Sequence, residues 1–122
     1  MIDVPQVLNL LEIAVSERGE DFHYEDYAQT DQGGYEIDPG ACAYRNPVTG
    51  QPLCIAGVVL KEAGLLDLVQ EDDVISHQPR LVGKISQDAL RVLDAAQAAQ
   101  DGNSTWGYAL VSARYLAEDL AS

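Results

Sequence analysis

The sequence predicts a mainly α-helical fold of about four helices that closes with an antiparallel helical hairpin. Three observations support this fold class: apolar residues recur at helical spacing in several segments, capping residues precede those segments, and glycines follow them. The chain has 122 residues, of which 47% are apolar. This composition is typical of a folded protein, and the length suits a single compact domain over residues 1–122.

The first predicted helix begins at Val4 and stops at Gly19. Asp3 can accept a hydrogen bond from the amides of the first turn, and Gln6, three residues later, can complete a capping box. A glycine at the end of the pattern is a common helix stop. The apolar stripe of this helix comprises Val4, Val7, Leu8, Leu11 and Val15.

The second predicted helix runs from Pro52 to Ala63 and ends at Gly64, since proline suits a first helical turn and glycine a helix end. Residues 53–60 are apolar on every side of this helix, which indicates a buried central position. The same run could instead be a strand that pairs with residues 41–45 in a short β-hairpin near 41–56. We favour the helix.

Two further helices end the chain. Ser86 is the expected cap of the first, which stops at Gly102, and Ser104 is the expected cap of the second, which Trp106 anchors in the core. The short link between them predicts the antiparallel hairpin. Asp101 opposes the dipole at its helix end, which indicates either a hydrogen-bonded turn or a functional polar contact. We favour the turn, in which Asp101 bonds to neighbouring backbone.

Acidic residues outnumber basic ones by 20 to 7, so the formal net charge is −13. Because phosphate contacts are made by clustered lysine and arginine, this charge argues against direct binding of nucleic acid or anionic membranes. Eight of the acids lie within residues 17–38, interleaved with aromatic side chains. We interpret residues 19–40 as an acidic aromatic loop on the surface.

This loop is the predicted partner-binding region, because tyrosine anchors many interfaces and the charge suits a basic protein. The residues that we expect to bind the partner are Glu20, Asp21, Tyr24, Glu25, Asp26 and Tyr27. The loop could instead cover one end of the core, with its acids merely solvated. A third interpretation is a DNA mimic that inhibits a nucleic-acid-binding protein.

The last predicted helix places two tyrosines, Tyr108 and Tyr115, off its main apolar stripe. They form either a second contact surface or a partly exposed face. The sequence makes no prediction of oligomeric state.

The enzymatic alternative is a cysteine-dependent hydrolase or transferase. Cys54 would be its nucleophile, because a helix start favours the thiolate, and His23 or His77 would be its base. The neighbours of Cys54 are small and apolar, however, which is typical of an inert buried cysteine. We therefore favour a non-enzymatic protein, and we expect Cys42 and Cys54 to stay reduced.

Other chemical sites are not predicted. The sequence contains no phosphate-binding loop and no dinucleotide fingerprint. Its cysteines and histidines lack the paired spacing of a zinc site, and its acids do not follow a calcium-loop pattern. We expect neither a metal nor a cofactor.

The start of the chain and its apolar runs bear on localisation. Residues 1–16 contain two acids and lack the basic start of a secretory leader. The longest apolar run, residues 53–60, is too short to cross a bilayer. We therefore expect a cytoplasmic protein with no membrane partner.

Four stretches of the sequence form a distinctive combination: Cys42-Ala43-Tyr44, residues 50–60, residues 97–102 and Trp106-Gly107-Tyr108-Ala109. This combination resembles a group of small uncharacterised proteins of actinobacteria and actinobacteriophages, over most of the chain from the first helix to Ala113. The resemblance implies a small protein that acts in the cytoplasm of an actinobacterial host and is encoded by the host or by a phage. No reaction is known for the group, so the resemblance implies no catalytic residues.

Overall fold

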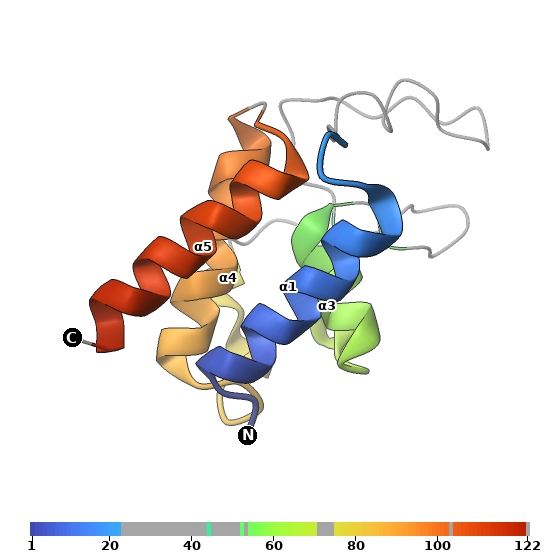
Figure 1. The fold of residues 1–122 in the computed structure, drawn as a ribbon. Coiled ribbons are helices and arrows are strands. Elements are labelled where there is room, and N and C mark those ends of the chain that lie inside the picture. The colour runs from blue at the N-terminus through green and yellow to red at the C-terminus, as the bar shows by residue number, and fades with distance from the viewer. Residues whose placement is uncertain (23–43, 45–51, 53, 71–74, 103, 122) are drawn as a thin grey trace.

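The computed structural model describes residues 1–22, 44, 52, 54–70, 75–102 and 104–121. Within these ranges the fold is helical and contains no β-strand (Figure 1). Isolated bridges join Ile85 to Ile2 and to Val82. The predicted mainly α-helical class is confirmed. Its elements are α1 (Val4–Arg18), α3 (Ile55–Glu62), α4 (Gln87–Asp101) and α5 (Trp106–Ala121), with 3₁₀ turns η1 (Leu66–Leu68), η2 (Ile75–His77) and η3 (Pro79–Leu81).

Helix α1 has the predicted ends. The Oδ1 of Asp3 accepts a hydrogen bond from the backbone N–H of Gln6 at 3.1 Å, and the Oε1 of Gln6 accepts one from the backbone N–H of Asp3 at 2.9 Å. Gly19 ends the helix at a φ of 101°, in the region that favours glycine. The capping box and the glycine stop are both confirmed.

The predicted C-terminal hairpin is present, with one correction at the start of α5. Ser86 caps α4 through a 3.1 Å hydrogen bond from Ala89 N–H, and Gly102 ends it. Helix α5 then runs back beside α4, and it also packs against α1 (Figure 1). The cap of α5 is Thr105 rather than Ser104, because the Thr105 hydroxyl accepts from Tyr108 N–H at 3.1 Å.

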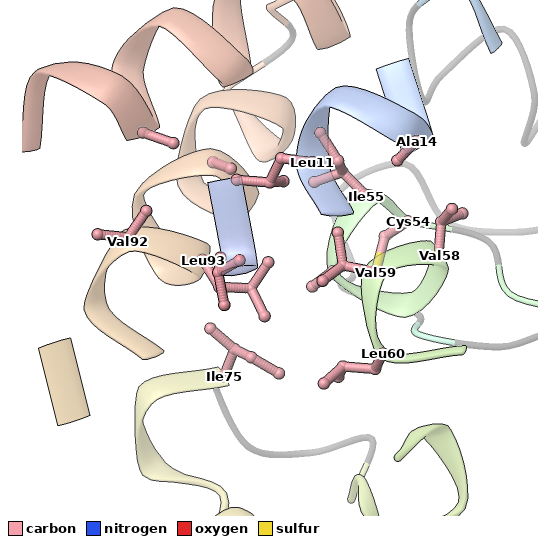
Figure 2. Close-up of a cluster of buried hydrophobic side chains, with 14 of the residues drawn as sticks. Leu11, Ala14, Cys54, Ile55, Val58, Val59, Leu60, Ile75, Val92 and Leu93 are labelled. Carbon is pink, nitrogen blue, oxygen red and sulfur yellow. The ribbon is translucent and has the colours of Figure 1, made fainter. Parts of the chain in front are cut away.

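Helix α3 lies in the core, as predicted, but begins at Ile55 rather than Pro52. Its first six residues are all buried, and Figure 2 shows its side chains among those of α1, α4 and η2. The strand alternative for residues 55–60 is therefore wrong. Of the proposed partner strand at 41–45, only Tyr44 belongs to the described residues.

Candidate functional site

The segment that follows α1 is attached to the first turn of α5. The backbone carbonyl of Phe22 accepts from Trp106 N–H at 2.8 Å, and that of Glu20 accepts from Gly107 N–H at 2.9 Å. The first amides of a helix have no partner inside it, so these carbonyls satisfy two of them. The backbone on both sides of Asp21 is thereby held against the start of α5.

An aromatic cluster on the inner side of this segment anchors it to the core. The Phe22 ring meets the fully buried Trp106 ring edge-on, with centroids 4.8 Å apart. The Arg18 guanidinium carbon lies 5.4 Å from the Phe22 centroid and 5.3 Å from that of Trp106, which is within cation–π range. The predicted core role of Trp106 is confirmed.

Outside this cluster, Glu20 and Asp21 border a pocket of about 360 Å³ together with residues of α5. The exposed side chains of Tyr108 and Val111 line the same pocket. Arg114, a further lining residue, forms an ion pair with Glu12 of α1. The pocket therefore combines two exposed carboxylates with apolar and aromatic surface.

The structure brings together two of the six predicted partner-binding residues, Glu20 and Asp21. The other four, Tyr24, Glu25, Asp26 and Tyr27, lie outside the described residues, as does His23. Sequence reasoning did not place Val111 in the site, and it did not join the acids to Tyr108. The feature of the sequence that could have indicated this site is the position of Tyr108 and Tyr115 off the apolar stripe of the last helix.

Cys54 occupies the cap position of α3 and has no exposed surface (Figure 2). Its Sγ accepts a hydrogen bond from Gly57 N–H at 3.4 Å. A nucleophile in this position needs an opening of the core before it can meet a substrate. The small apolar neighbourhood predicted for an inert cysteine is the environment that the structure shows.

His77, the described candidate base, is exposed in η2. It lines a separate cavity of about 400 Å³ with Gln87, Arg91 and Asp94 of α4, and Cys54 is not among the residues that line it. General base catalysis requires hydrogen-bond reach between base and nucleophile. The catalytic use of Cys54 stays a prediction.

The remaining amides at the start of α3 are satisfied by two buried glutamines of α4. The Oε1 of Gln100 accepts from Ile55 N–H at 2.7 Å, and the Oε1 of Gln97 accepts from Ala56 N–H at 3.0 Å. The side-chain amides of both glutamines donate to Oδ1 of Asp101, at 3.1 Å and 3.3 Å respectively. Asp101 therefore orients the glutamines, and the prediction that it bonds neighbouring backbone is wrong.

Desolvation of the Asp101 carboxyl raises its pKa. The hydrogen bonds from Gln100 and Gln97 lower this pKa, and the nearby negative charge of Asp94 raises it. The net shift of the pKa is upward, so the folded environment disfavours the ionised form of Asp101.

Two kinds of feature are absent from the described residues. No group of three or more histidine, cysteine or acidic side chains gathers there in a way that could hold a metal ion. No helix in this part of the chain is both long enough and apolar enough to cross a membrane.

Comparison with protein-family models, with curated proteins and with solved structures finds no significant match.

Proposed function

We propose that this chain is a non-enzymatic acidic domain that binds a basic surface of another protein. The binding region is the acidic aromatic segment of residues 20–27. In keeping with the resemblance to proteins of actinobacteria and their phages, the domain would act in the host cytoplasm as an accessory or regulatory factor.

The observation that carries this proposal is the pocket shared by Glu20, Asp21, Tyr108 and Val111. Backbone hydrogen bonds to α5 hold residues 20–22 in place, so little conformational entropy is lost at Glu20 and Asp21 when a partner binds. Tyrosine beside exposed carboxylates suits a protein surface that carries both apolar and basic side chains.

A protein partner is favoured over mimicry of DNA by the composition of this pocket. A phosphate mimic needs carboxylates in a track, whereas here they border aromatic and aliphatic surface. Apolar contact area contributes to protein association but has no counterpart in the phosphate backbone. The DNA mimic therefore stays the third interpretation, after the cysteine-dependent enzyme.

Affinity capture from an actinobacterial lysate tests the proposal. The bait is the full chain, and the comparison is a variant with Glu20, Asp21, Glu25 and Asp26 all changed to Ser. We expect recovery of the specific partner to fall by roughly tenfold or more, because each tenfold step needs only about 1.4 kcal/mol. Unchanged recovery would reject residues 20–27 as the binding surface.

A matched pair of variants separates local from global charge. Glu20→Ser/Asp21→Ser and Glu62→Ser/Asp67→Ser each remove two exposed acids and change the net charge equally. We expect only the first pair to weaken capture. Equal losses in both would indicate long-range attraction by the net charge instead of a local site.

A further inference from the structure

Helix α5 presents a stripe of large apolar and aromatic side chains to solvent, formed by Tyr108, Val111 and Tyr115. These side chains are 59%, 42% and 71% exposed, respectively. Their spacing of three and then four residues places them on one face of the helix. The stripe is continuous with the acidic pocket, because Tyr108 and Val111 line both.

The opposite face of α5 is also apolar, and it packs inside the fold. Its buried residues are Trp106, Leu110 and the three alanines Ala109, Ala113 and Ala117. The core therefore covers this face of α5 and leaves Tyr108, Val111 and Tyr115 in contact with solvent. A surface helix of a globular protein normally carries polar residues on its outer face, so the stripe needs a different explanation.

The charge around the stripe is negative at both ends. Glu20 and Asp21 line the same pocket as Tyr108 and Val111, the first two residues of the stripe. Glu118, which is exposed, follows Tyr115 by three residues and is therefore its neighbour on the helix surface. The positive charge near the middle, that of Arg114, is compensated by Glu12.

This charge pattern decides between two occupants. A second copy of the chain would bring a further −13 charges to the same acidic surface, and like charges in contact destabilise an interface. A basic partner gains attraction at both ends of the stripe and apolar burial along it. An amphipathic helix offers apolar side chains at the matching spacing, flanked by positions for lysine and arginine.

We propose that the α5 stripe receives an amphipathic helix of the partner, whose apolar face packs on Tyr108, Val111 and Tyr115 and whose lysine or arginine residues meet the flanking acids. This inference rests on the proposed function and specifies the class of partner. It assigns apolar contact to α5 and charge contact to the acidic residues at its two ends.

The test measures binding of a fluorescently labelled helical peptide to the full chain by anisotropy. The peptide contains leucine and lysine over about 16 residues, roughly 24 Å of helix, with leucines at helical spacing. A peptide of the same composition in scrambled order is the matched ligand. We expect the patterned peptide to bind at least about tenfold more tightly than the scrambled one.

The decisive variant is Tyr108→Ser/Tyr115→Ser, which we expect to weaken binding of the patterned peptide by about tenfold or more. The control is Val82→Ser, because Val82 is 73% exposed but lies between η3 and α4, outside the stripe. Circular dichroism should show unchanged helix content, since these side chains are on the surface.

The results of these experiments distinguish the stripe, the acidic residues and the helical occupant from one another. If Tyr108→Ser/Tyr115→Ser binds the patterned peptide as well as wild type does, while Glu20→Ser/Asp21→Ser binds it more weakly, the stripe is not the binding surface and the proposed function still stands. If only the tyrosine variant binds more weakly, the stripe is the binding surface and residues 20–27 are not. Equal affinity for both peptides, or no binding of the patterned peptide, overturns the helical occupant. A wild-type dimer in light scattering that Tyr108→Ser/Tyr115→Ser abolishes would identify a second copy instead.

Discussion

The starts of α3 and α5 meet the same backbone requirement in opposite surroundings. In both helices, first-turn N–H groups donate hydrogen bonds to acceptors from distant parts of the chain. At α3 the acceptors are two buried glutamine side chains of α4, whereas at α5 they are backbone carbonyls of the segment after α1. The first arrangement encloses Cys54, and the second holds Glu20 and Asp21 at the surface beside exposed tyrosine.

Because of this difference, we expect substitutions at the two helix starts to affect folding stability and partner binding differently. The α3 start is completely buried, so changes there act on folding. The α5 start has a buried side at Trp106 and an exposed side at Tyr108, so changes there can act on folding and on binding together. Five predictions test this division, in order of decreasing expected effect.

The largest contrast is expected in the reactivity of Cys54. Iodoacetamide should modify it roughly a thousandfold more slowly in the native chain than in urea, because exposing a fully buried thiol requires opening costing about 4 kcal/mol or more. Peptide mapping by mass spectrometry separates Cys54 from Cys42. A native rate near the denatured one would instead support the cysteine-dependent enzyme.

Gly57→Ala should be the most destabilising substitution, at about 3 kcal/mol. A Cβ at this position would lie 2.1 Å from the backbone oxygen of the buried Tyr44, so backbone must move. Urea denaturation followed by Trp106 fluorescence measures the loss. Gly102→Ala is the control, because its new Cβ would lie 3.5 Å from the nearest carbonyls and should cost less than about 1 kcal/mol.

Gln100→Met should destabilise the fold by about 2 kcal/mol. The side chain keeps a similar length, but Ile55 N–H loses its buried acceptor. Gln87→Met, the same change at the exposed start of α4, should be within about 0.5 kcal/mol of wild type. Equal stabilities of the two variants would show that the glutamine cap contributes nothing.

Gly107→Ala should cost about 1 kcal/mol and should also weaken peptide binding. The added Cβ would lie 2.9 Å from the Glu20 carbonyl oxygen and 3.1 Å from the Glu20 Cβ, so the backbone at Glu20 must shift. Denaturation and anisotropy measure the two effects. If the variant is less stable but binds the peptide with unchanged affinity, the position of Glu20 does not matter for binding.

The smallest effect is expected for Asp101→Asn, which keeps an oxygen that can accept from both glutamines. A raised pKa means that the folded chain retains the Asp101 proton more readily than the unfolded chain. Wild-type stability should therefore fall relative to the variant as pH rises from below 3.8 through the raised pKa, and should remain lower at neutral pH. The difference should stay below about 1 kcal/mol, because the carboxyl is partly exposed and screened. Paired denaturation curves at several pH values measure it, and an opposite slope would contradict the assignment.

The helix ends show how far the amino-acid sequence alone determines the structure. The caps at Asp3 and Ser86 and the stops at Gly19 and Gly102 follow from residues three or four positions apart. Such hydrogen bonds form within one turn, so their pattern is visible in the sequence. The apolar spacing of the helices is equally local, and the mainly α-helical class with its C-terminal hairpin follows from it.

Tertiary structure decided the rest. Helix α3 starts at Ile55 because glutamines 41 and 45 residues away complete its first turn. The acids of residues 20 and 21 meet Tyr108 because the chain after α1 folds back onto α5. Local spacing cannot specify these contacts, since they depend on how whole helices pack. The sequence by itself determined which segments are helical, that Cys54 lies in an apolar neighbourhood and that the surface is acidic. Packing alone decided which glutamines complete the start of α3 and that two acids stand beside an exposed apolar stripe.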